Sequence, residues 1–180
     1  HQDPPYPRLK RELTHPEKPH PLFSCRGKRP EPLPRRDIMA TLGEDPKRLG
    51  IFFFFDAQGV ADSYVEALLA DMVKNLSELV IVVNGELTAT SYAKLSAFTD
   101  NIILRENKGL DAWAYKTALE SYGWDRLVEF DEVVLFNATI MGPVYPFEEM
   151  FTEMAGRNID FWGITWFHEV PFDPFGYAEE

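Results

Sequence analysis

The chain has 180 residues, of which 45% are hydrophobic and 26% charged; this is the composition of a folded globular protein and excludes a wholly disordered chain. Its formal net charge of −11 disfavours nucleic acid as a partner, because an acidic body repels phosphate backbones. The single cysteine, Cys25, excludes an intrachain disulfide and any metal site with several cysteine ligands.

Residues 1–36 differ in composition from the rest of the chain. They hold nine of the 14 prolines and carry nine Lys or Arg against four Asp or Glu. Proline at this density prevents helices and strands from propagating, so we predict a Pro-rich basic arm or linker. A second interpretation stays open, in which the arm docks on the acidic body, on a partner or at a membrane surface. Residues 37–180 are predicted to form one domain.

Regular elements are predicted from residue 49 onwards. Residues 49–55 form a continuous apolar run, which predicts a strand buried on both faces, with Phe52 to Phe55 in the sheet core. The run is too short to cross a membrane, which takes about 20 residues. Ser63 and Glu66 have the spacing of a capping box, and a helix is predicted from there to about residue 76.

The alternation of strands and helices continues to residue 165. The further predictions are strands at 79–83, 101–107, 132–136 and 159–165, and helices at 88–98, 111–122 and 146–154, the first of these helices only weakly indicated. Crossovers of this length keep neighbouring strands parallel. The sequence therefore predicts an open α/β fold, with a mostly parallel twisted sheet and flanking helices, of Rossmann-like type.

Ligands of such sheets bind where loops leave the carboxyl ends of the strands. The side chains in that position are Asp56, Asn84, residues 105–111 and residues 137–142. Neither the glycine-rich dinucleotide motif nor the P-loop is present in the sequence, and the nucleophile elbow and zinc-protease motifs are absent too. Any ligand site at this edge must therefore use other side chains.

Residues 105–116 are the most informative stretch. Arg105 and Lys108 precede a predicted helix whose first N–H groups lack intrahelical partners, an arrangement suited to an anion such as a diphosphate. Gly109 would allow close approach of the backbone. Asp111 is either the helix N-cap or a hydrogen-bond partner of ligand hydroxyls. An ordinary surface turn with solvated ions is the competing interpretation.

Five aromatic side chains are candidates for stacking on a sugar or a nucleobase: Trp113, Tyr115, Trp162, Trp166 and Phe167. Trp162 is favoured instead as a core residue, because it lies within an apolar segment.

Three segments resemble the rhamnan synthesis protein F family. They are Arg-Glu-Asn-Lys-Gly-Leu-Asp-Ala-Trp-Ala-Tyr-Lys (105–116), Phe-Asp-Glu-Val-Val-Leu-Phe-Asn-Ala-Thr-Ile-Met-Gly-Pro (130–143) and Asp-Phe-Trp-Gly-Ile-Thr (160–165), and the resemblance spans about residues 48–168. It implies a bacterial cell-surface polysaccharide glycosyltransferase, related to enzymes that add L-rhamnose from a dTDP-sugar in rhamnan or lipopolysaccharide assembly. The layout is also similar to a GT-A glycosyltransferase.

The resemblance carries expectations about partners. The donor would be a nucleotide-sugar, dTDP-rhamnose, and the acceptor a polysaccharide or a lipid-linked glycan. The location would be cytoplasmic, at the inner face of the plasma membrane if the protein associates with it peripherally. Residues 37–180 would be the donor-binding part of a larger domain. A non-catalytic nucleotide-sugar-binding or assembly module of the same pathway is the alternative.

One departure from the GT-A pattern concerns the metal. The position of the Asp-x-Asp metal motif reads Asn137-Ala138-Thr139, and an amide with a hydroxyl holds a hard divalent cation poorly. We therefore expect no Mg²⁺ or Mn²⁺ cofactor here, and expect Arg105, Lys108 or Lys116 to offset the charge of the leaving diphosphate.

The predicted donor-binding residues are Asp56, Asn84, Arg105, Asn107, Lys108, Gly109, Asp111, Lys116, Asn137 and Thr139. Transfer with inversion needs a carboxylate base for the acceptor hydroxyl. The candidates are Asp160, Glu169 and Asp173. Asp160 begins the predicted fifth strand, at the edge away from the expected cleft, so Glu169 and Asp173, just after that strand, fit the geometry better; the sequence does not choose the base.

Overall fold

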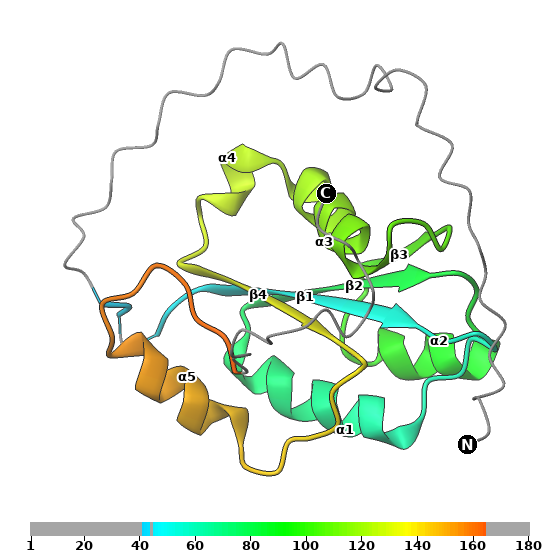
Figure 1. Ribbon diagram of the computed structural model, residues 1–180, viewed down its shortest axis with the longest axis horizontal. Helices are drawn as coiled ribbons and strands as arrows, with labels where there is room; N and C mark the ends of the chain where they lie inside the picture. The colour runs from blue at the N-terminus through cyan, green and yellow to red at the C-terminus, as the bar shows by residue number, and fades with distance from the viewer. Residues whose placement is uncertain (1–40, 44, 165–180) are drawn as a thin grey trace, which may run out of the picture. The chain divides into compact units, whose positions relative to one another are not determined.

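A computed structural model describes residues 41–43 and 45–164 (Figure 1). The predicted arm, residues 1–36, lies outside the described residues. So do Trp166, Phe167, Glu169 and Asp173.

The described residues build one parallel sheet of four strands. The strands are β1 (Arg48–Phe55), β2 (Glu78–Asn84), β3 (Ile102–Arg105) and β4 (Glu132–Asn137), and their order in the sheet is β3-β2-β1-β4. Every neighbouring pair is parallel. The predicted open, Rossmann-like α/β architecture is confirmed.

Helices cover both faces of the sheet (Figure 1). One face carries α1 (Ser63–Met72), the short 3-10 helix η2 (Val73–Asn75), α2 (Ala89–Ser96) and α5 (Phe147–Ala155), and the other carries α3 (Leu110–Tyr122) and α4 (Trp124–Leu127). Each layer has its own core. Phe52 and Phe54 of β1 pack toward α1, whereas Leu49 and Ile51 pack toward α3, as the two-residue period of a strand requires.

The predicted capping box at the start of α1 is wrong. Asp62 is the N-cap, and its side chain makes no capping hydrogen bond. Glu66 does not reach back to the N-cap, because its carboxylate pairs with Lys94 of α2 at 2.7 Å. The helix nevertheless begins at Ser63, as expected.

The predicted fifth strand is wrong over the described residues 159–164, which form no strand. The Trp162 indole donates to Glu132 at 2.6 Å and packs edge-on against Phe151, whereas Phe161 is 89% exposed. The indole N–H needs a polar partner when buried, and it finds one on β4 rather than in a new strand. The preference for Trp162 as a core-packing residue is confirmed.

Fewer residues of the phenylalanine run 52–55 are buried than the sequence predicts. Phe52 and Phe54 are buried, but Phe55 is 45% exposed at the carboxyl end of β1. The strand outlasts its neighbour β4 there, since Asn137 pairs with Phe53 and nothing on β4 pairs with Phe55.

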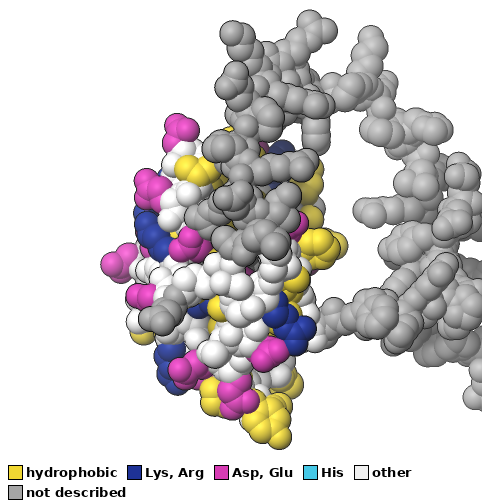
Figure 2. Space-filling view, turned by 90° about the vertical axis from the view of Figure 1, so that its left-hand side faces the viewer, with side chains coloured by type: hydrophobic (Ala, Val, Ile, Leu, Met, Phe, Trp, Pro, Cys, Tyr) yellow, Lys and Arg dark blue, Asp and Glu magenta, His cyan; other side chains and the backbone are white. Residues whose placement is uncertain are grey.

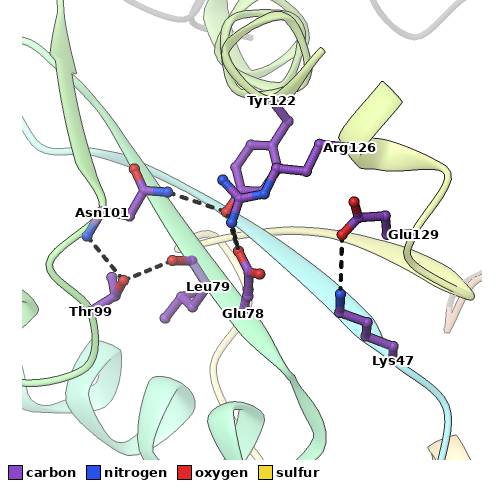
Figure 3. A network of polar contacts seen from close by, with 8 residues as sticks. All are labelled: Lys47, Glu78, Leu79, Thr99, Asn101, Tyr122, Arg126 and Glu129. Atoms are coloured by element: carbon purple, nitrogen blue, oxygen red, sulfur yellow. Dashed lines mark hydrogen bonds and ion pairs between the residues drawn. The ribbon is translucent and has the colours of Figure 1, made fainter. Parts of the chain in front are cut away.

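A polar network fastens the amino edge of the sheet (Figure 3). Glu78 of β2 accepts hydrogen bonds from Tyr122 at 2.9 Å and from Arg126 at 2.7 Å. Asn101 in turn donates to the Tyr122 hydroxyl at 3.2 Å. These bonds join the last residue of α3 and the short helix α4 to the first residue of β2. They lie at the amino ends of the strands and do not involve side chains at the carboxyl ends.

The surface in Figure 2 carries both signs of charge. Acidic and basic side chains are interspersed on this face rather than gathered into a patch of one sign. This face therefore gives no sign of a broad anion-binding surface.

Candidate functional site at the carboxyl edge of the sheet

The strand order reverses between β1 and β4. From β1 the chain builds β2 and β3 on one side, and then returns to place β4 on the other side of β1. The carboxyl ends of strands at such a reversal are where open α/β sheets bind ligands. Polar side chains from all four strand ends lie along this edge, in two groups separated by Phe55.

The first group centres on Asn84, the last residue of β2, which is completely buried. Its Oδ1 accepts a hydrogen bond from Arg105 Nη1 at 2.6 Å. Its Nδ2 donates to Asn107 Oδ1 at 3.1 Å and to the Leu110 carbonyl at 3.4 Å. One buried amide thus joins the end of β3, the loop after it and the start of α3.

Arg105 has a second partner in the same loop. Its Nη2 donates to the Lys108 carbonyl at 2.8 Å, so the guanidinium holds the loop closed while remaining partly exposed. Lys108 is exposed and forms an ion pair with Glu106. That contact, chiefly its hydrogen bond, holds the pKa of Glu106 below its usual value.

Helix α3 begins one residue earlier than predicted. Gly109, with φ +69°, is its N-cap, and Leu110 has φ +51°. The N-cap interpretation of Asp111 is therefore wrong, since Asp111 lies in the first turn and accepts from the Ala112 N–H at 2.8 Å. Glycine is required at 109, because a Cβ there would overlap the Trp113 indole and the left-handed φ disfavours other residues.

Two further predicted residues have local partners. Asp56 Oδ1 accepts from the N–H groups of Gln58 and Val60, both at 2.9 Å, and so shapes its own loop. Lys116 is exposed, with its ammonium 6.0 Å from the centre of the Trp113 ring and 3.6 Å from a Glu120 carboxylate oxygen.

The second group lies at the end of β4. Asn137 Oδ1 accepts from the Thr139 N–H at 3.1 Å and from the Thr139 hydroxyl at 2.5 Å. Tyr115 of α3 lines the same pocket as Asn137, and its ring meets Phe53 edge-on with centroids 6.4 Å apart. Burial, with a smaller contribution from Asp111, raises the pKa of Tyr115 to about 12.

A pocket of about 540 Å³ runs along β4 beside this second group. Tyr115 and Asn137 line it, together with Val133, Leu135 and the segment 159–164 that includes Asp160. Its described lining contains no Lys or Arg. Arg105 is not part of it: β3 and β4 are opposite edges of the sheet, about 14 Å apart at the usual strand spacing.

The structure thus groups Asn84, Arg105 and Asn107, with Lys108 and Gly109 in the same loop, at the ends of β2 and β3, and Asn137 with Thr139 at the end of β4. Asp160 lines the pocket along β4, in a segment that is bonded to the first residue of that strand. Helix α3 borders both groups, because the carbonyl of its first residue accepts from Asn84 and its Tyr115 lines the same pocket as Asn137. Tyr115 is predicted from the sequence only as a stacking ring. Its place beside Asn137 in one pocket does not follow from spacing, because the two residues are distant in the chain.

Comparison with known proteins places the chain in a family. Residues 79–180 match the family model of rhamnan synthesis protein F. Comparison with curated proteins and with solved structures gave no significant match. Within the described part of the chain, no helix has the length and apolar character needed to cross a membrane. Because the match covers more than half of the sequence and includes both polar groups at the sheet edge, the chain belongs to the rhamnan synthesis protein F family.

Proposed function

We propose that the chain is a glycosyltransferase domain that binds a nucleotide-sugar at the carboxyl edge of its sheet and transfers the sugar to a growing cell-surface glycan. By the family resemblance the sugar is L-rhamnose, the donor dTDP-rhamnose, and the acceptor a polysaccharide or lipid-linked glycan at the cytoplasmic face of the membrane. The observation that carries the proposal is the row of polar side chains along this one edge, in a chain of a rhamnan synthesis family.

The diphosphate is assigned to the group around Asn84. Arg105 is held there by two hydrogen bonds, and Lys108 lies exposed in the same loop. Both charges are next to the start of α3, where helix N–H groups favour an anion. A cation fixed before the ligand arrives stabilises the leaving diphosphate without reorganisation.

We propose that transfer does not use a divalent ion at Asn137. Both hydrogen bonds that the Asn137 Oδ1 accepts come from Thr139, so that oxygen is already engaged. The amide and hydroxyl carry no charge, and Mg²⁺ or Mn²⁺ prefers carboxylate oxygens. The residues at this position therefore do not fit the metal.

A non-catalytic nucleotide-sugar-binding module is the second candidate. One observation favours it: Asp56, in the loop after β1, and Asp111, in the first turn of α3, both accept backbone N–H bonds and are poorly placed to take a proton from an acceptor. Of the three carboxylates proposed as the base, Asp160 lies within the described residues. It lines the pocket beside β4.

Thermal-shift measurements with dTDP, UDP and GDP, and with their sugars, test both candidates, because a ligand that binds only the folded state raises its stability. We expect dTDP-rhamnose to raise the melting temperature of the wild type. Arg105→Gln should lose most of this shift. Arg126→Gln, which changes a residue at the amino ends of the strands, should keep the full shift in melting temperature.

Release of dTDP in the presence of a lipid-linked glycan then separates the two candidates. Turnover that persists in EDTA supports a metal-independent transferase. Turnover abolished by EDTA and restored by Mn²⁺ contradicts the metal-free proposal. Stabilisation without turnover favours the binding module, and a melting temperature that no nucleotide changes rules out both.

A further inference from the structure

Strand β4 is an edge of the sheet, and its outer side has no strand partner within the described residues. Along a strand, the backbone N–H and C=O groups of alternate residues point to the same side. Because the Ala138 N–H donates to the Phe53 carbonyl at 3.1 Å and Asn137 is the register partner of Phe53, the even-numbered residues of β4 face β1. The N–H and C=O groups of Val133, Leu135 and Asn137 therefore point away from the sheet.

These outward backbone groups receive no hydrogen bond from the part of the chain that the structure describes. Unpaired groups on a strand edge are a template for a further strand, and sheets usually protect their edges with short strands or charged side chains. The opposite edge follows this rule, since β3 has four residues and ends at Arg105. In contrast, β4 has six residues, and its exposed side chains Val133 and Leu135 are apolar.

The pocket beside β4 follows this edge. Every residue from 131 to 137 lines it. Because successive side chains of a strand point to opposite faces, a pocket on one face of the sheet would be lined by alternate residues only. Lining by consecutive residues therefore places the pocket along the backbone edge. Residues 159–164 line it too, and the bond from the Trp162 indole to Glu132 holds that segment beside the start of β4.

The charges of the pocket favour a basic group in its occupant. The described lining contains Asp131, Glu132 and Asp160, and no Lys or Arg. The charge of Glu132 is balanced by Arg48, whose Nε lies 2.6 Å from the carboxylate. The complementarity therefore rests on Asp160, which is exposed and belongs to the segment held beside the start of β4. Further along the strand the lining is mainly apolar.

We propose that the outer edge of β4 binds an extended segment of a partner protein, which adds a strand to the sheet. The outward groups of β4 form the backbone hydrogen bonds, apolar side chains of the segment fill the pocket, and a Lys or Arg of the segment lies near Asp160. Main-chain bonds give such a complex its affinity, and the pocket beneath alternate side chains gives it specificity. This partner surface goes beyond the proposed function, and it is tested without any nucleotide.

The probe is a synthetic peptide with blocked ends, Lys-Val-Thr-Val-Thr-Val-Lys, titrated by calorimetry into the whole chain. A second peptide carries glutamate in place of both lysines. We expect the lysine peptide to bind, and the glutamate peptide to bind at least about threefold more weakly, by a difference that added salt reduces. Equal affinities, or no binding of the lysine peptide, overturn the proposal while the proposed function stands.

Two N-methylated peptides test whether the bound segment is a strand. An extended peptide presents alternate N–H groups to opposite sides, so each peptide is methylated on one of the two alternate sets of amides. We expect one of them to lose at least about tenfold in affinity, the worth of about two hydrogen bonds, and the other to bind like the unmodified peptide. Equal affinities of the two methylated peptides overturn strand addition.

A variant of the protein tests the same bonds from the other side. Leu135→Pro removes an outward N–H without removing a bond to β1, and proline is tolerated in edge strands where the N–H faces solvent. Leu135→Val is the matched control that keeps the N–H. We expect the peptide to bind Leu135→Pro at least about threefold more weakly than Leu135→Val, at similar melting temperatures. Equal affinities of the two folded variants overturn the proposal; if Leu135→Pro does not fold, the methylated peptides decide.

Light scattering distinguishes a partner protein from a second copy of this chain. We expect the wild type to be monomeric at the concentrations used for titration, with the edge of β4 available to the peptide. A dimer that Leu135→Pro or the lysine peptide dissociates would make another copy of β4 the occupant of this edge, and would overturn the proposal of a different partner.

Discussion

Asn84 Oδ1 and Arg105 Nη1 lie 2.6 Å apart and join the carboxyl ends of β2 and β3. The amide is completely buried, and its other hydrogen bonds fix the Asn107 side chain and the first carbonyl of α3. The loop that carries the candidate phosphate ligands is thus organised from within the sheet rather than by its own turn residues.

Asn84→Ala should therefore lower the free energy of unfolding by about 1–3 kcal/mol, because buried partners lose their hydrogen bonds. Urea denaturation measures the loss. Asn101→Ala is the control at the amino edge, where the side chain is exposed and donates to Tyr122, and a smaller loss is expected there. Equal losses in the two variants would contradict a special role for the buried amide.

Gly109→Ala should destabilise the protein by at least about 1 kcal/mol, because φ is left-handed and the new Cβ would overlap Trp113. Gly156→Ala is a matched control at the end of α5, where φ is −76° and the nearest atom to a Cβ would be 3.7 Å away; it should be neutral or slightly stabilising. Chemical denaturation compares the two. A neutral Gly109→Ala would show that the loop readily adopts another conformation.

Glu132→Gln should cost about 3 kcal/mol, because it leaves the charge of Arg48 buried without its partner. The Arg48 Nε to Glu132 oxygen distance is 2.6 Å, and both side chains are largely buried. Glu153→Gln breaks an ion pair with Arg157 between two exposed side chains and should cost less than about 1 kcal/mol. Unfolding midpoints that shift equally would refute the distinction.

Asp71 is expected to make stability fall in acid. Its carboxylate accepts from Lys74 and from the Phe147 N–H at the start of α5, which holds its pKa below the usual 3.8. The unfolded chain then binds the proton more readily, so the stabilisation is complete above pH 3.8 and is lost as the pH falls through the folded-state pKa.

Asp71→Asn should accordingly be less stable than the wild type at pH 7, by about 1 kcal/mol for a lost helix-end contact, and the difference should shrink below the ordinary carboxyl pKa. Denaturation from pH 2 to pH 7 measures this convergence. A difference that stays constant over the whole range would show that the carboxylate charge is unimportant.

Tyr115 gives the opposite pH dependence. Because its pKa is raised from 10 to about 12, the folded state retains the proton longer than the unfolded state. Its stabilisation is complete below pH 10 and is lost as the pH rises to about 12. In a Tyr122→Phe background, which removes the other tyrosine with a raised pKa, Tyr115→Phe should flatten the stability profile above pH 10. An unchanged alkaline slope would refute the assignment.

Local sequence patterns predicted the helices and strands in which apolar residues recur without interruption at the period of the element. The apolar run of β1 and the helical spacing of α1 were sufficient, because burial on these faces depends on side-chain period alone. The apolar run of β2 likewise predicted that the strand ends next to Asn84. The position of polar side chains at the carboxyl ends of the strands could be predicted from these strand ends.

Features that depend on distant partners could not be predicted. The segment 159–164 has the apolar character of a strand, but Trp162 bonds Glu132 and the segment stays outside the sheet. Helix α3 begins at Leu110, after its N-cap Gly109, and both of these residues adopt a positive φ that the sequence does not announce. Tyr115 and Asn137 line one pocket, although only the folded sheet brings their two segments together.

Helix α3 has 13 residues; the carbonyl of its first residue accepts from Asn84, and Tyr115 in its second turn lines the pocket beside β4. One helix therefore borders both polar groups at the carboxyl ends of the strands. A substitution that displaces the start of α3 is expected to perturb the two groups together, so the effects of such a substitution should not be read as those of one group alone.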